Sequence, residues 1–153
     1  MMNDKVATNG SEGCELCRLP GGEVLYRDDN YRIVLVKDER YPGFCRVIWN
    51  AHVREMTDLS TVERAILIAA VWQVEETVRE VMQPHKVNVA SLGNVVPHVH
   101  WHIMPRYEDD AHFPDPVWSP VRRTPSSTSL ARRSALVPKL REVLLDRFQE
   151  SLL

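Results

Sequence analysis

The sequence predicts an α+β fold with an antiparallel sheet of about five strands, one long central helix and a C-terminal helix. Short segments in which apolar and polar residues alternate recur along the chain, most of them separated only by turns. One longer segment with apolar residues at helical spacing lies between the third and fourth of these. Strands so close together in sequence are typical of antiparallel neighbours rather than of β-α-β units. At 153 residues, the chain is long enough for one domain with a sizeable core.

Turn residues bound the predicted strands. Asp28-Asp29-Asn30 predicts a hairpin turn between the first two strands, and Tyr41-Pro42-Gly43 predicts the turn before the third. A turn at Gly93-Asn94 precedes the last strand. The five segments predicted as strands are 23–27, 31–36, 44–49, 86–92 and 98–106.

Two helices are predicted. Ser60-Thr61-Val62-Glu63 has the form of a capping box, which satisfies two unpaired N–H groups where a helix begins. Apolar residues then recur every three or four positions as far as Met82, and Pro84 ends the helix. The second helix is predicted from Leu130 to Leu153, with a break at Pro138.

Composition limits the domain organisation and the function. Residues 1–13 are polar and predict a flexible N-terminal tail, so 14–153 is expected to form one domain with a C-terminal extension from about residue 107. A net charge of −2 gives no basic surface for non-specific nucleic-acid binding. No apolar run is long enough to span a membrane. Three cysteines, without an apolar N-terminal signal, favour the reducing cytoplasm.

The segment from Pro97 to Arg106 concentrates the chemistry of the chain. Three histidines, His98, His100 and His102, alternate here with large apolar residues, so a strand would place all three imidazoles on one face. Imidazole accepts, donates or attacks near neutral pH. Metal binding and catalysis are therefore both open interpretations, beside an inert solvated face.

Cys14 and Cys17 form a C-x2-C pair with the spacing of metal ligands. A tetrahedral site needs two further donors, and reduced core thiols are the alternative. A thiol redox function is weaker, because the pair lies in a polar segment without the helix start that lowers a thiol pKa.

His98-Val-His100-Trp-His102-Ile-Met104 resembles the signature of the histidine triad family, in which histidines alternate with apolar residues. His52, after the third strand, is similar to that family's upstream histidine, and the C-x2-C pair resembles that of its zinc-containing members. The resemblance covers roughly residues 14–106. It implies a HIT-like fold, a homodimer formed through the long helix and the adjoining sheet edge, and a structural zinc ion. The ligands that it implies for zinc are Cys14, Cys17, His52 and His98.

The resemblance also implies nucleotidyl transfer. His100 would attack the α-phosphorus of a dinucleoside polyphosphate or nucleoside phosphoramidate, with His102 and His98 completing the catalytic set. The positions implied for substrate binding are Asn88, Asn94 and His52, with Gly93-Asn94 standing where the family usually has Gly-Gln. The Pro-rich segment that follows is similar to that of a bacterial branch described as diadenosine tetraphosphate hydrolase-like. The alternative function is a slow-turnover nucleotide- or zinc-binding regulatory module.

Overall fold

The computed structural model describes residues 11–150. They contain a five-stranded sheet made of β1 (Glu23–Arg27), β2 (Tyr31–Leu35), β3 (Cys45–Trp49), β4 (Lys86–Ala90) and β5 (His100–Arg106). The spatial order is β1-β2-β3-β5-β4, and every neighbouring pair is antiparallel. The predicted α+β class, antiparallel sheet and strand number are confirmed. Most of the predicted N-terminal tail, residues 1–10, lies outside the described residues, as do 151–153.

The central helix α2 (Thr61–Met82) has the bounds that its capping box and proline predict. The Ser60 hydroxyl accepts from the Glu63 N–H, and the Glu63 carboxylate accepts from the Ser60 N–H. Gln83 adopts a left-handed conformation with φ of 47° and closes the helix one residue before Pro84. Two short helical elements precede α2 in the chain, namely α1 (Glu15–Arg18) and the 3₁₀ turn η1 (Met56–Asp58). Within residues 11–150, no helix combines the length and apolarity needed to cross a bilayer.

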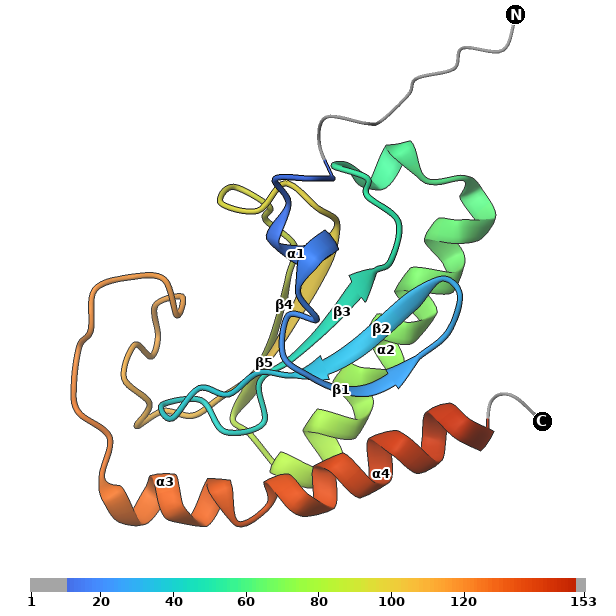
Figure 1. Ribbon diagram of the computed structural model, residues 1–153. Coiled ribbons are helices and arrows are strands. Elements are labelled where there is room, and N and C mark those ends of the chain that lie inside the picture. The colour runs from blue at the N-terminus through green and yellow to red at the C-terminus, as the bar shows by residue number, and fades with distance from the viewer. Residues whose placement is uncertain (1–10, 151–153) are drawn as a thin grey trace, which may run out of the picture.

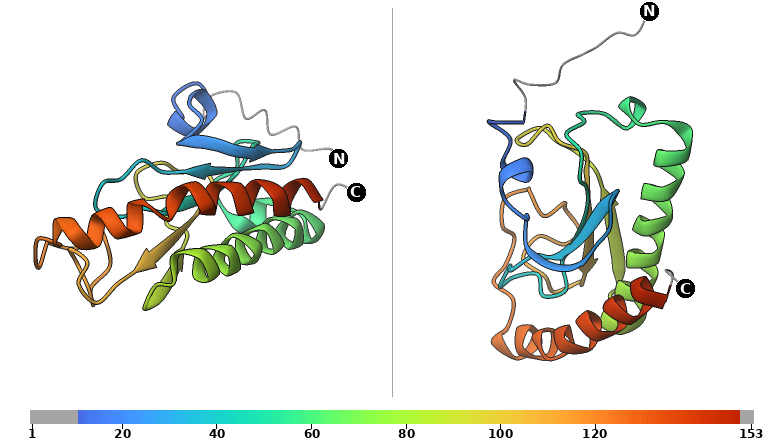
Figure 2. Two further views of the ribbon diagram at one scale, coloured as in Figure 1. Left: turned by 90° about the horizontal axis from the view of Figure 1, so that it is seen from below. Right: turned by 45° about the vertical axis from the view of Figure 1, so that its right-hand side comes forward.

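The two faces of the sheet have different coverings because side chains alternate along each strand. On one face, α2 and α4 (Val137–Glu150) cover the main apolar core, whereas α1 lies against the opposite face (Figures 1 and 2). Residues that the sheet contributes to the helix-covered core include Ile33, Leu35, Cys45, Val47 and Ile103. His100 and His102 therefore point to the face where α1 lies.

The C-terminal segment differs from the predicted single helix. It forms α3 (Ser127–Ser134) and α4, and the break lies at residues 135–136 rather than at Pro138. Pro138 is instead in the first turn of α4, where its missing N–H costs nothing. Leu140, Leu144 and Phe148 of α4 enter the main core, so this extension is part of the domain's packing.

The fifth strand also begins later than predicted, at His100. The His98 N–H bonds to the Val96 carbonyl in a tight turn, and the Val99 N–H bonds to the Val53 carbonyl outside the sheet ladder. His98 therefore lies just before the strand. Its predicted position on a regular strand is wrong, although it stays close to the other histidines.

Candidate functional site

His100 is held in one orientation by the backbone. Its Nδ1 lies 2.5 Å from the carbonyl oxygen of His98, which can only accept, so Nδ1 carries the proton and donates. Nε2 therefore keeps its lone pair. The Ser91 hydroxyl donates to the His100 carbonyl oxygen at 2.7 Å and fixes the strand at this residue.

His100 and His102 are both uncharged at neutral pH. Burial lowers the pKa of His100 in spite of its bond to the His98 carbonyl, and the positive charge of Arg46 acts in the same direction. Burial also lowers the pKa of His102, with contributions from His100 and Arg46, to about 4. The two ring centroids lie 4.8 Å apart in an edge-on arrangement. The pair thus offers neutral imidazoles, one with an oriented lone pair.

A pocket of about 550 Å³ opens in front of these two histidines. Its volume is within the range of sites that hold nucleotide-sized molecules. Its walls come from distant parts of the chain: α1, β3, the loop before β5, and the Pro-rich loop after β5, which contributes Trp118. The residues that line it include Glu15, Leu16, Arg46, Asn94, Val95, Val96, His100, His102 and Trp118.

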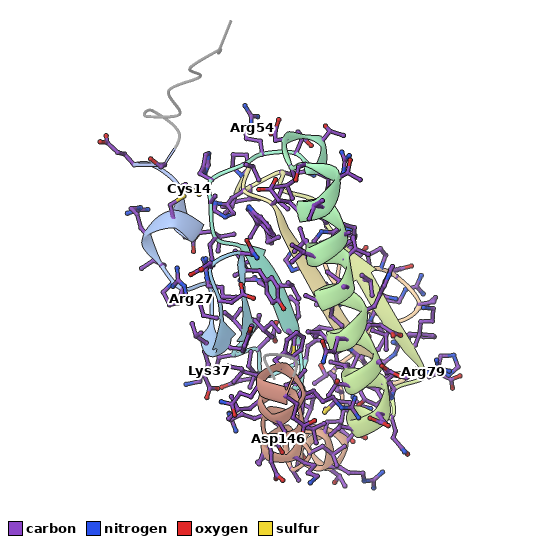
Figure 3. The ribbon with its side chains drawn as sticks, turned by 90° about the vertical axis from the view of Figure 1, so that its right-hand side faces the viewer. Cys14, Arg27, Lys37, Arg54, Arg79 and Asp146 are labelled. Carbon is purple, nitrogen blue, oxygen red and sulfur yellow. The ribbon has the colours of Figure 1, made fainter. Side chains whose placement is uncertain are left out.

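A second group of side chains gathers beside the first histidine of the triad. The Sγ of Cys14 and of Cys17 lie 3.4 and 3.5 Å from His98 Nδ1, and Cys17 Sγ lies 3.4 Å from His52 Nδ1. The two Nδ1 atoms are 3.3 Å apart. Figure 3 shows Cys14 at the end of the molecule opposite Asp146, which lies on α4. The sequence-predicted ligand set is therefore assembled in one place.

These separations match the edges of a tetrahedron around one metal ion. Bonds of about 2.3 Å to sulfur and about 2.0 Å to nitrogen require S–N edges of about 3.5 Å and N–N edges of about 3.3 Å. The four donor atoms all lie within 4.8 Å of one another. His98 Nε2 donates to the Trp49 carbonyl at 2.6 Å, which leaves the Nδ1 lone pair for a cation. Cys14, Cys17, His52 and His98 can thus hold a metal.

The loop that follows β5 is fastened by a buried ion pair that sequence reasoning missed. Asp110 is fully buried and accepts from Arg106 Nε at 2.8 Å and from three backbone N–H groups of its own loop. His112 in the same loop is buried, with Nδ1 2.5 Å from the Tyr41 hydroxyl. The same loop contributes Trp118 to the lining of the pocket.

The predicted substrate-binding residues fall in different places. Asn94 lines the pocket. Asn88 lies on β4, outside the lining, and its Oδ1 accepts from Arg106 Nη1 at 2.7 Å. His52 lies in the cysteine and histidine cluster. Arg46 lines the pocket although the sequence pattern did not single it out, because its approach depends on strand pairing. Trp118 also lines the pocket. The sequence marked its Pro-rich loop as ordered or lid-like without deciding whether that loop lies at the site.

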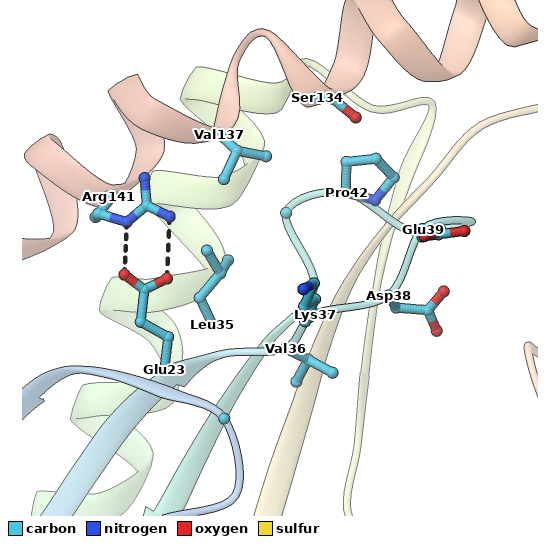
Figure 4. A pocket seen from close by; sticks show the side chains of 12 residues that line it. Glu23, Leu35, Val36, Lys37, Asp38, Glu39, Pro42, Ser134, Val137 and Arg141 are labelled. Atoms are coloured by element: carbon cyan, nitrogen blue, oxygen red, sulfur yellow. Dashed lines mark hydrogen bonds and ion pairs between the residues drawn. The ribbon is translucent and has the colours of Figure 1, made fainter.

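Another cavity of about 550 Å³ lies at the opposite end of the sheet, between the loop after β2 and helices α3 and α4 (Figure 4). Its wall includes Leu35, Val36, Pro42 and Val137, and a two-bond ion pair between Glu23 and Arg141 closes one side. None of the histidines or cysteines lines it. The candidate active site is therefore the pocket at His100.

Two curated relatives are similar to part of the chain. The AP-4-A phosphorylase of Mycobacterium tuberculosis is 32% identical over 47% of this chain and 40% of its own length. The bis(5'-nucleosyl)-tetraphosphatase [asymmetrical] of Schizosaccharomyces pombe is 29% identical over 67% of this chain and 59% of its own. The chain thus spans about half the length of these two relatives.

Solved structures share the fold. A histidine triad protein from Marinobacter aquaeolei superimposes with a TM-score of 0.64 and 27% identity, covering 82% of this chain and 92% of that one. A zinc-bound histidine triad family protein from Mycobacterium smegmatis has a TM-score of 0.56 and 23% identity, covering 88% and 99%. The family model for the HIT domain matches residues 21–109, which is more than half of the chain, and the protein therefore belongs to the histidine triad (HIT) family.

Proposed function

We propose that this protein is a nucleotidyl hydrolase or transferase that cleaves a nucleotide at its α-phosphate through a covalent intermediate on His100. The observation that carries the proposal is the fixed tautomer of His100. Its Nδ1 proton is held by the His98 carbonyl, and its uncharged ring lines a pocket of suitable size. The substrate class is a dinucleoside polyphosphate or a nucleoside phosphoramidate, in keeping with the names of the two curated relatives.

The reaction has two displacements at phosphorus. In the first, the Nε2 lone pair of His100 forms a bond to the α-phosphorus, and the leaving group departs with its bonding electron pair and takes up a proton. In the second, water bonds to the phosphorus and loses a proton, while the electron pair of the P–N bond returns to Nε2. The His98 carbonyl stabilises the positive charge that His100 carries in between, since its bond to Nδ1–H strengthens as the ring becomes cationic.

His102 assists at the same phosphoryl group. With its pKa lowered to about 4, it is neutral at pH 7 and carries one ring N–H that can donate to a phosphate oxygen. It lies two residues from His100 on the same face of β5. His98 takes part through its backbone, which orients the nucleophile, and through its side chain, which belongs to the metal-binding set.

Cys14, Cys17, His52 and His98 are proposed to bind one structural zinc ion. A closed four-ligand zinc site supplies folding free energy and leaves no open position for substrate. Here it would tie the segment around α1 to the residue whose carbonyl orients His100. His52 thus contributes to substrate binding only by way of this site. The expectation that no helix starts at the cysteine pair is wrong, because α1 begins directly after Cys14. Burial nevertheless raises the pKa of the Cys17 thiol to about 11, which disfavours a thiol redox function.

Asn94 is proposed to bind the substrate directly from the pocket wall. The predicted role of Asn88 rests on its amide nitrogen, because its oxygen is committed to Arg106. The family usually has glutamine at this position, and the side chain of Asn94 is shorter. The preference for a leaving group and a base therefore depends on the other residues that line this pocket.

Product analysis tests the function and separates its two forms. With diadenosine tetraphosphate as substrate, attack by water on the intermediate gives AMP and ATP, whereas attack by inorganic phosphate gives ADP and ATP. We expect turnover by the wild type with at least one acceptor and none by His100→Gly, with His85→Gly as a matched control outside the pocket. Wild type that binds nucleotide without any product would instead establish the regulatory-module alternative.

The protein is also proposed to form a homodimer and to act in the cytoplasm. Trp72 and Val62 on α2 are 54% and 69% exposed, and β4 is an edge strand with unpaired backbone groups. A second copy would bury these groups. Size-exclusion chromatography with light scattering is expected to give twice the mass of the 17.6 kDa chain for wild type and the monomer mass for Trp72→Glu. A wild-type monomer would contradict the dimer.

A further inference from the structure

Arg46 is the residue of the pocket that neither the triad pattern nor the metal cluster explains. It lies on β3, directly opposite His102 in the antiparallel ladder with β5. Its strand neighbours Cys45 and Val47 are fully buried in the helix-covered core, so Arg46 projects from the other face, where His100 lies. Cross-strand partners have Cβ atoms about 5 Å apart, so the Cβ of Arg46 lies beside that of His102.

The guanidinium has hydrogen-bonding capacity that the protein does not use. Nη1 donates to the Gly21 carbonyl at 3.0 Å, and the guanidinium carbon lies 5.4 Å from the centroid of the Phe44 ring. Within residues 11–150, Nε is buried and has no hydrogen-bond partner. The bond from Nη1 thus orients the guanidinium, while the Nε–H donor still lacks an acceptor.

The charge of the pocket favours an anion at this position. Arg46 is the positively charged side chain among the described residues that line the pocket. Glu15 lies on the α1 side of the same pocket and is exposed. A phosphoryl group at His100 carries negative charge on its non-bridging oxygens, and this charge is met by donors in the transition state.

Resting on the function proposed above, we infer that Arg46 is a phosphate-binding residue, which donates to a non-bridging oxygen of the nucleotide at His100. The guanidinium discriminates a nucleotide from a nucleoside, and it stabilises the phosphoryl charge as the P–N bond forms. The other role open to Arg46 is to brace the turn at Gly21 through Nη1. Loss of a purely structural contact to Gly21 would weaken the binding of nucleotide and nucleoside equally. Loss of a phosphate contact would weaken only the binding of the nucleotide.

The test compares AMP and adenosine as ligands in calorimetric titrations of the full-length, metal-loaded protein. Arg46→Met removes the charge and the donors. Arg46→Gln removes the charge and keeps an amide N–H that can donate to the Gly21 carbonyl. Arg27→Met is the matched control, because Arg27 is an exposed arginine on β1 outside the pocket lining (Figure 3). Thermal denaturation checks that each variant is folded.

For both Arg46 variants we expect the Kd of AMP to rise about 10- to 100-fold, the range for loss of a charge-assisted hydrogen bond. The Kd of adenosine should stay within about threefold of wild type, and kcat/KM for diadenosine tetraphosphate should fall by a factor similar to that for AMP binding. The control should match wild type. Equal weakening of AMP and adenosine, or AMP binding that survives in Arg46→Gln, would overturn the inference and leave the function of His100 standing. Wild type that neither binds AMP nor turns over substrate would overturn both.

Discussion

Replacement of Asp110 by asparagine should destabilise the whole domain, because this buried carboxylate fixes the loop that contributes Trp118 to the pocket wall. The change keeps the shape of the side chain and removes its charge. Arg106, which is 2% exposed, would then lose its buried ionic partner. In addition, the new amide nitrogen would face N–H donors, since the carboxylate accepts from Arg106 and from the backbone of Tyr107, His112 and Phe113.

The magnitude follows from two independent considerations. Burial alone would raise the pKa of Asp110, but the hydrogen bonds from Arg106 and the three backbone amides outweigh burial and lower the pKa from 3.8 to about 2. At about 1.4 kcal/mol per pKa unit, this depression corresponds to roughly 2 to 3 kcal/mol of stability at pH 7. Breaking a buried ion pair by removing one partner costs about 3 to 5 kcal/mol. Together the two ranges lead us to expect that Asp110→Asn lowers the free energy of unfolding by about 2 to 5 kcal/mol.

The assay is urea unfolding of metal-loaded protein, followed by tryptophan fluorescence at pH 7. Asp115→Asn is the control, because its side chain forms an exposed ion pair with Arg122 and should leave the midpoint unchanged. A depressed folded-state pKa gives stability that is complete above the unfolded pKa near 4 and is lost as the pH falls toward 2. The difference between wild type and Asp110→Asn should therefore be constant from pH 7 to 5 and shrink below about 4. A change under about 1 kcal/mol at pH 7 would refute the role assigned to the buried pair.

Three further predictions concern the metal, the pocket wall and the C-terminal helix. Purified protein should hold one zinc ion per chain, and Cys17→Ser should lose it while His85→Ala keeps it; wild type without bound metal would contradict the zinc assignment. Trp118→Ala should raise KM several-fold without lowering thermal stability, since the exposed ring lines the pocket and can stack on a base. An unchanged KM would remove Trp118 from the site. Phe148→Ala should cost about 3 to 5 kcal/mol in urea unfolding, because the ring is 1% exposed. A loss within about 1 kcal/mol would mean that α4 is dispensable for the core.

Local signals in the sequence were enough for several parts of the structure. The bounds of α2 follow from a capping box and a proline, both of which act within one helical turn. The common face of His100 and His102 follows from alternation along one strand. The resemblance to zinc-containing HIT proteins picked out the ligand set whose four donors the structure brings together.

The remainder depends on which segments meet in space, and no local pattern encodes this. The polar position of Arg46 on its strand is visible in the sequence, but only the register of β3 against β5 places it opposite His102. His112 is buried because its loop packs against Tyr41, whose hydroxyl contacts both His112 and Asp110. The start of β5 is set by the hydrogen bond from the Val99 N–H to Val53, a residue far away in the chain.

The covalent intermediate on His100 is tested most directly by intact-protein mass spectrometry. Wild type and His100→Gly would each be mixed with an adenosine phosphoramidate or a dinucleoside polyphosphate and stopped rapidly without acid, because a phosphorus–nitrogen bond is acid-labile. We predict an added mass equal to one adenylyl group on the wild type and none on His100→Gly. Release of AMP by wild type without any adduct, or an adduct that survives in His100→Gly, would contradict the account.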